Sequence, residues 1–385
     1  REQYEDILRL VRLYEPQIPL LDRALAAPDP QVPTADSSDF LLPYLTDVRQ
    51  MARWLAVSGH YRAGTGDCAG AFRDFERILE LGNLVCRGGC LINHLVGIAC
   101  DAIAADAAWV VASRERVPAP VFRDAARAFL AAHDEAEPYV EAIRAEALVG
   151  TSSVHMLYRD PSSMLSSGLS GYSLPVHQRT LLRSLFGMLP LVGSTPASTT
   201  RNLDACYQHL VVLAEKPYTP ATVAEYVKFT DRIRLDNPAK ILFLTRDPLG
   251  MVFAAMFMPS LDRAHLKATH RDAILRGMAL FLAVRAYETE HGAPPETLDA
   301  LVPDYLPRIP EDPFDGKPFR YLRRNVPGLP PEAWAVYSIG ENFTDEGGTA
   351  YGAGTQARVP GASTRYTPNP DFVWPSVDYP KAGGK

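Results

Sequence analysis

Proline divides this sequence into two unequal parts. Fifteen of its 33 prolines lie between Pro294 and Pro380. Proline lacks the backbone N–H that a helix interior needs, so this last quarter is not built from long helices. Upstream of it, apolar residues recur at helical spacing between short glycine, serine and proline breaks. The sequence therefore predicts an α+β protein with a large all-α helical body and a small mixed domain after it.

The upstream part contains a series of helix-like segments. We expect helices over residues 2–14, 40–61, 68–81, 91–111, 121–148 (one or two helices), 176–189, 202–215 and 219–234. Leu91–Val111 is almost wholly apolar or small, which places it in the middle of a bundle. Thr219 precedes Pro220 and is typical of an N-cap residue.

Two of these helices are joined by a short turn. The turn Gly64–Asp67 precedes a helix with Ala71 and Phe75 at small and large positions. This segment resembles one tetratricopeptide-type hairpin, although no second copy follows at a period of about 34 residues. An ordinary helical hairpin is the alternative that the sequence leaves open.

The last part changes in character. Leu261–His291 predicts a long helix that Gly292 ends. Short strand-like runs follow at residues 319–322, 333–339 and 371–374, and they predict a short antiparallel sheet. We therefore expect three regions: a helical domain at 1–150, a helical domain with a Ser/Gly-rich loop (161–175) at 151–260, and an α+β domain at 261–385.

The α+β region carries a series of fixed-looking turn and strand positions. They are Tyr287, Gly292, Pro295, Leu298, Leu301, Val302, Pro303, Asp312, Pro313, Phe314, Gly316, Pro318, Tyr321, Tyr337, Ser338, Gly340, Gly347 and Gly348. In this order they resemble the C-terminal globular domain of type II secretion major pseudopilins. The resemblance covers residues 262–375 and implies a pseudopilin-like fold for this region.

The whole layout also resembles a set of envelope proteins of planctomycete-type bacteria that is defined by sequence alone. Asp67, Ala71, Asp74 and the run Leu91–Ala99 fit the helical pattern of that set. The resemblance implies a periplasmic or cell-surface location and implies no activity. Because the sequence starts at Arg1 and not at Met, we expect an upstream export or membrane-anchoring segment.

The pseudopilin resemblance also implies a calcium site. Major pseudopilins hold calcium in the loop after the second strand, and Glu341, Asp345 and Asp371 would supply carboxylate ligands here. Asn342 and Glu346 lie in the same loop, and Glu341 stands where the family usually has Asp. The alternative is that these carboxylates cap turns and face solvent.

No catalytic motif is present. The five cysteines form no CxxC, the nine histidines form no HExxH, and no P-loop or dinucleotide fingerprint occurs. Cys86 and Cys90 lie in CRGGC, where the pair Gly88–Gly89 predicts a turn. The two cysteines predict either a disulfide or two buried thiols. The acids and glycine of Asp312–Gly316 are explained by turn chemistry.

A formal charge of −6 argues against a nucleic-acid partner, and no run of 18 apolar residues predicts a membrane span.

Two functions remain open. The first is a noncatalytic structural or assembly protein of the cell envelope, whose partners are other envelope proteins or further copies of itself. The second is an envelope enzyme with an unrecognised site in the helical domain. A deep cleft with converging polar residues would favour the enzyme, and a broad exposed apolar patch would favour assembly.

Overall fold

The computed structural model describes residues 9, 11–28, 30, 42–159, 194–233, 247–257, 261–349 and 371–377. Its α-helices are α2 (Ile18–Leu25), α3 (Tyr44–Gly64), α4 (Cys68–Cys86), α5 (Leu91–Arg114), α6 (Ala119–Asp134), α7 (Tyr139–Arg159), α10 (Pro196–Ala214), α11 (Pro220–Ile233), α13 (Pro248–Phe257) and α14 (Leu261–His291). The strands are β1 (Arg320–Leu322), β2 (Ala335–Ser338) and β3 (Phe372–Pro375). The predicted segments at 161–175 and 176–189 lie outside the described residues.

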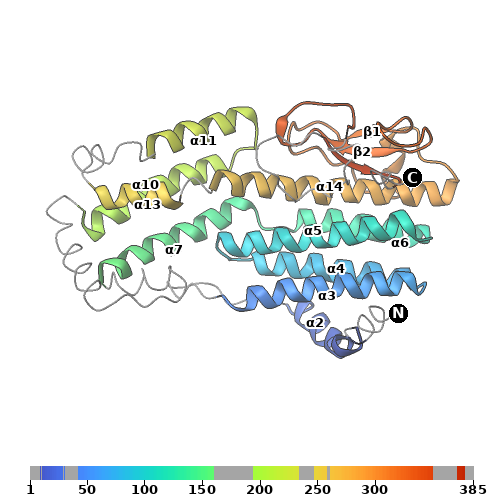
Figure 1. The fold of residues 1–385 in the computed structure, drawn as a ribbon, viewed down its shortest axis with the longest axis horizontal. Coiled ribbons are helices and arrows are strands. Elements are labelled where there is room, and N and C mark those ends of the chain that lie inside the picture. Colours follow the sequence, from blue (N-terminus) through green and yellow to red (C-terminus); the bar gives the residue numbers. More distant parts are fainter. Residues whose placement is uncertain are drawn as a thin grey trace, which may run out of the picture.

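Helices α3 to α6 form a bundle (Figure 1). Asp67 caps α4, since its side chain accepts a hydrogen bond from the Gly70 backbone N–H at 2.9 Å. Gly59 of α3 lies against the ring of Phe75, where a Cβ atom would meet Phe75 Cε1 at 2.3 Å. The predicted helical hairpin is therefore present, with a glycine opposite its large residue.

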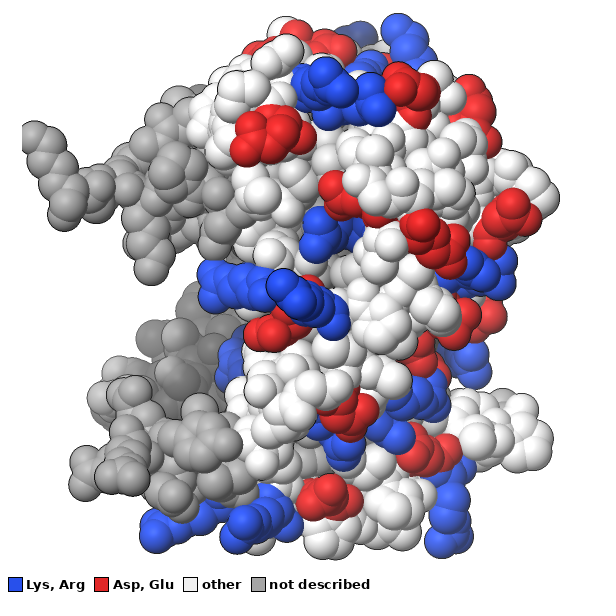
Figure 2. Space-filling model, turned by 90° about the vertical axis from the view of Figure 1, so that its right-hand side faces the viewer, with Lys and Arg blue, Asp and Glu red and all other residues white. Residues whose placement is uncertain are grey.

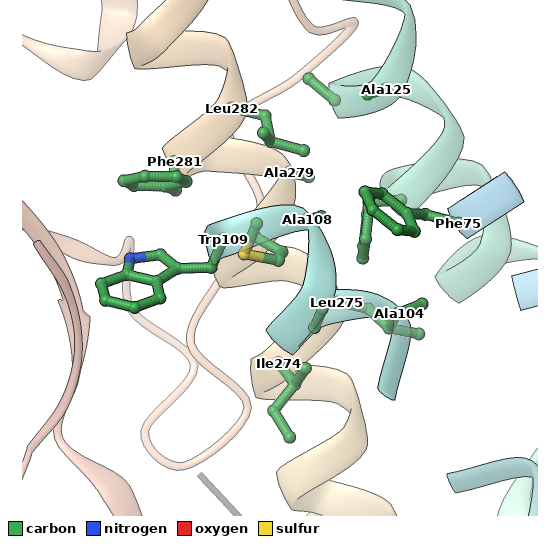
Figure 3. Close-up of a cluster of buried hydrophobic side chains, with 14 of the residues drawn as sticks. Phe75, Ala104, Ala108, Trp109, Ala125, Ile274, Leu275, Ala279, Phe281 and Leu282 are labelled. Atoms are coloured by element: carbon green, nitrogen blue, oxygen red, sulfur yellow. The ribbon is translucent and has the colours of Figure 1, made fainter. Parts of the chain in front are cut away.

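The 31-residue helix α14 lies between this bundle and the small sheet (Figure 1). It packs against α5 and α6 on one side and against β2 and β3 on the other. Apolar side chains of α4, α5, α6 and α14 meet in the core shown in Figure 3, among them Phe75, Ala108, Ala125 and Leu282. Burial on both sides explains why apolar residues occupy more than one face of α14.

The predicted antiparallel sheet is confirmed, with strand order β1-β2-β3. Tyr321 pairs with Val336, and Val336 pairs with Trp374. The sheet is attached to the bundle through Trp109 of α5, whose Nε1 donates to the Pro375 carbonyl oxygen at 3.3 Å. One hydrophobic core therefore includes residues of the bundle, of α14 and of the sheet. The boundaries at residues 150 and 260 stay predictions.

A second group of helices extends the molecule away from the sheet (Figure 1). It consists of α7, α10, α11 and α13, which share a separate apolar cluster around Tyr207, Leu210 and Tyr226. Thr219 caps α11 as predicted, since its hydroxyl accepts a hydrogen bond from the Thr222 backbone N–H at 3.3 Å.

Among the described residues, Leu91–Arg114 is the single helix long and apolar enough to span a membrane, and 61% of its most apolar window is buried inside the protein. A core helix of a globular protein has the same length and composition. On the face drawn in Figure 2, acidic and basic side chains are interspersed rather than gathered by sign.

Candidate functional site

A cleft of about 880 Å³ lies where the bundle, the second helical group and the tail meet. Its floor is one face of α14. Its walls come from α5, the α6–α7 junction, the α10–α11 connection and the turn at residues 311–316. The polar residues that line it include His94, His133, Asp134, Glu137, Lys216, His265, Asp272, Arg276, Asp312 and Asp315.

The helical period of α14 produces the floor. His265, Thr269, Asp272 and Arg276 follow one another at spacings of three or four residues, so they share one face of the helix. His270 lies on another face, between the rings of Phe314 and Phe372. His265 and His270 are five residues apart on α14 and therefore face different ways.

His133 connects α6 to the cleft floor. Its Nδ1 lies 2.9 Å from Asp134 Oδ1, and its Nε2 accepts a hydrogen bond from Arg276 Nε at 3.0 Å. Asp134 also pairs with Arg308 of the tail. Burial lowers the pKa of His133, so the imidazole is neutral at pH 7. Both ring nitrogens are therefore occupied by internal contacts.

The other end of the cleft is aromatic. The His265 ring stacks on Tyr139 at a centroid distance of 5.1 Å and meets Tyr218 edge-on at 5.3 Å. The Tyr226 hydroxyl lies 3.0 Å from His265 Nδ1. Burial lowers the pKa of His265 to about 4. The ring is thus a neutral polar group among apolar neighbours.

The turn Asp312–Gly316 forms part of the cleft wall and has the structural role that its sequence indicates. The Gly316 backbone N–H donates to the Asp312 carbonyl oxygen at 2.8 Å, and Gly316 has a φ of +69°. The Asp312 carboxylate is fully buried and accepts hydrogen bonds from the Ile339 backbone N–H, the Ser338 hydroxyl and Arg320. It holds the turn against β2.

Two of the three predicted calcium ligands lie at one loop. Asp371 Oδ2 accepts from the Gly348 backbone N–H at 2.7 Å, and Asp345 Oδ1 accepts from the Gly347 backbone N–H at 2.9 Å. Burial, and then the nearby charges of Glu346 and Asp345, raise the pKa of Asp371 to about 6. Glu346 Oε2 is buried without a hydrogen-bond partner among the described residues.

The third predicted ligand, Glu341, is directed toward a different group, because its Oε2 lies 3.2 Å from His270 Nε2. Within the described ranges, no three His, Cys, Asp or Glu side chains are close enough to hold a metal ion. The orphaned Glu346 oxygen and the crowded carboxylates suit a hard cation. As they stand, however, Asp345 and Asp371 satisfy backbone N–H groups, so carbonyl or water ligands would also be needed.

The CRGGC segment forms the turn between α4 and α5. Gly88 has a φ of +62°, and Cys86 and Cys90 are both buried free thiols. Burial raises the pKa of Cys86 to about 12, so its thiol is unreactive at neutral pH.

Sequence reasoning missed the cleft. His133 and Asp134 are adjacent in the sequence, but their partners Arg276 and Arg308 are more than 140 residues away. The one available signal was the helical spacing of His265, Asp272 and Arg276 along α14. Comparisons with protein-family models, with curated proteins and with solved structures found no match to this chain.

Proposed function

We propose that this chain is a noncatalytic structural or assembly protein of the cell envelope that acts through protein–protein contacts. The observation that supports it is the state of the reactive groups in the cleft. His133 is held between Asp134 and Arg276, and Lys216 Nζ is held by Glu225 at 2.6 Å. Among the described residues of the cleft, no serine, threonine, cysteine or lysine is hydrogen-bonded to a histidine or a free carboxylate that could act as its base.

The same proposal covers the α3–α4 hairpin and the α+β tail. The α3–α4 hairpin would be a single tetratricopeptide-type unit in a body that docks other envelope proteins or further copies of this chain. The tail would be a pseudopilin-like head, which its order of long helix, antiparallel strands and acidic loop supports. Location in the periplasm or at the cell surface is part of this proposal.

We also propose a calcium ion at the acidic loop. Asp345 and Asp371 would contribute carboxylate oxygens, and Glu346 is a better candidate than Glu341 for the third. What supports this choice is that Glu346 raises the pKa of Asp371, whereas Glu341 approaches His270. The ion would relieve the mutual repulsion of the loop carboxylates.

An envelope enzyme is the second candidate, and the cleft itself favours it. Polar groups from five separate segments converge on a recess at the junction of helical groups, which is a common place for active sites. On this alternative, Asp272 and His265 would be the groups nearest to a substrate.

Purification of the full chain from the native envelope, with cross-linking before extraction, tests the first candidate. We expect defined cross-links between surface residues of α3–α6 or the tail and one recurring partner or a second copy. Monomeric chain without specific cross-links, together with turnover of a small molecule that Asp272→Asn abolishes, would support the enzyme instead.

A further inference from the structure

One carboxylate on the cleft floor has no hydrogen-bond partner among the described residues. The Asp272 side chain is 39% exposed, and its Oδ1 lies 3.7 Å from His133 Nε2. That nitrogen already accepts a hydrogen bond from Arg276, and the His133 ring is neutral. His133 therefore leaves the charge of Asp272 in place.

The two neighbouring arginines form hydrogen bonds with residues other than Asp272. Arg271 donates to Asp101 and to Asn83, and Arg276 donates to His133 and to the Glu311 carbonyl oxygen. They attract the Asp272 carboxylate only at a distance. Burial outweighs this attraction and raises the pKa of Asp272. The carboxylate is thus half-buried and has no cation from the described ranges in direct contact.

Three other carboxylates of this protein, which are at most 1% exposed, have partners inside the chain. Asp101 pairs with Arg271, Asp74 pairs with Arg77, and Asp312 accepts several hydrogen bonds. Asp272 differs from them because its side chain is 39% exposed in the cleft. Its carboxylate is therefore open to a partner from outside the chain.

The rest of the cleft indicates what that partner carries. Seven Asp or Glu residues line the cleft against three Lys or Arg residues. Arginines outside the lining pair with Asp134, Glu215 and Asp315, whereas Asp272 has no arginine or lysine of the described part in contact. A metal ion is held by several ligands, whereas one carboxylate is enough to pair with a singly charged organic cation. An organic cation is therefore the better match to Asp272.

The opposite end of the cleft suits an apolar stem. Pro138, Tyr139, Pro217 and Tyr218 line it, beside the ring of His265. His265 is 6% exposed, and its Nε2 has no hydrogen-bond partner among the described residues. Seven residues separate His265 from Asp272 along α14, which is about 10 Å of helix. A ligand that contacts both would be an extended chain that ends in a charge.

We propose that this cleft binds an ammonium or guanidinium group on an apolar stem, with the cation on Asp272 and the stem along Pro138, Tyr139 and Tyr218. The cation can be a lysine or arginine side chain of a partner polypeptide or a free alkyl amine. The inference does not rest on the proposed assembly function, because a binding protein and an enzyme would both use such a site.

Titration calorimetry on the full chain tests the proposal with matched probes. N-acetyl-lysine amide carries the cation, and N-acetyl-norleucine amide has a similar stem without charge. We expect saturable binding of the lysine probe and affinity for the norleucine probe that is weaker by about tenfold or more. A lysine-containing tripeptide and cadaverine form two further arms. Tighter binding of the tripeptide identifies a polypeptide source, and tighter binding of cadaverine identifies a free amine.

Asp272→Asn should weaken binding of the lysine probe by about tenfold or more, since the variant keeps the shape and removes the charge. Asp304→Asn, an exposed acid outside the cleft, is the matched control and should bind as the wild type does. The melting temperature without ligand separates this role from a structural one. Loss of an unneutralised carboxylate should leave it unchanged or raise it, whereas loss of a structural contact would lower it.

A second measurement uses the wild-type protein alone. The carboxyl ¹³C resonance of Asp272 should report a fall in its pKa when the lysine probe binds. Three results would each overturn the proposal. They are equal affinity for the lysine and norleucine probes, unchanged affinity for the lysine probe in Asp272→Asn, and an Asp272 carboxyl resonance that does not change when the lysine probe is added.

Discussion

Arg271 of α14 forms an ion pair with Asp101 of α5, 170 residues earlier in the sequence, and the two side chains are only 5% and 1% exposed. Arg271 Nη2 also donates to Asn83 Oδ1 at 2.5 Å, and Asn83 Nδ2 donates to the Ala132 carbonyl oxygen at 2.9 Å. This network joins α4, α5, α6 and α14. It fixes the rotation of α14, and thereby the face that α14 presents to the cleft.

Removal of the arginine should destabilise the protein strongly. Arg271→Met leaves Asp101 buried without its cation, and we expect a loss of about 3–5 kcal/mol in the free energy of unfolding, measured by urea denaturation. Arg263→Met, an exposed position on the same helix, should change it by less than about 0.5 kcal/mol.

The double variant Arg271→Met with Asp101→Leu should recover most of that loss, because no buried charge is left unpaired. If the double variant is as unstable as Arg271→Met alone, packing and not the ion pair explains the effect.

His265 should make the protein sensitive to acid. Its pKa is about 4 in the folded state against 6.5 for an ordinary histidine, since burial disfavours the imidazolium. The unfolded chain therefore binds the proton more readily. This contribution to stability is present above pH 6.5 and is lost as the pH falls toward 4.

Between pH 6.5 and 5 the expected loss from this residue is about 1.6 kcal/mol, because the full slope of about 1.4 kcal/mol per pH unit is reached only below pH 6.5. His265→Gln keeps a polar partner for Tyr226 and does not titrate, so its unfolding free energy should fall less over the same interval. Equal pH profiles for the two proteins would show that His265 is accessible to protons in the folded state.

The sequence predicts features that depend on residues close together in the chain, and it does not predict contacts between residues far apart in the chain. The N-cap Thr219, the turn at Gly88 and the strand around Val336 follow from local chemistry, and the structure agrees with all three. The cleft depends on where α14 lies relative to α6 and the tail. Contacts such as Arg276 with His133 are set by packing over long separations, which no local pattern encodes.

The contact between α14 and the sheet should depend on a small residue. A Cβ atom at Gly277 would lie 2.4 Å from Trp374 Cη2, so Gly277→Ala would push β3 away from the helix. We expect the overpacking to cost about 1–3 kcal/mol, partly offset by the higher helix propensity of alanine.

Gly64→Ala is the control, because a Cβ atom there meets nothing within 4 Å. Thermal denaturation of both variants should show a clear fall in melting temperature for Gly277→Ala alone. A fall of the same size in Gly64→Ala would point to a general effect of the substitution.

The acidic loop should respond to both calcium and pH. The pKa of Asp371 is raised to about 6, so the folded state binds a proton more readily than the unfolded chain does. This contribution to stability is fully present below pH 3.8, the ordinary value, and is lost as the pH rises through 6. A bound calcium ion would compensate the loss at neutral pH, because it replaces the proton as the partner of the carboxylates. Excess calcium should therefore raise the melting temperature at pH 7.5 and have a much smaller effect at pH 4.5.

Asp371→Asn and Asp345→Ala should reduce the calcium response, whereas Glu341→Gln should retain it, since Glu341 approaches His270 instead. Magnesium at the same concentration controls for ionic strength. An unchanged melting temperature with excess calcium at pH 7.5 would exclude a calcium site in this loop and leave its carboxylates with the role of capping backbone turns.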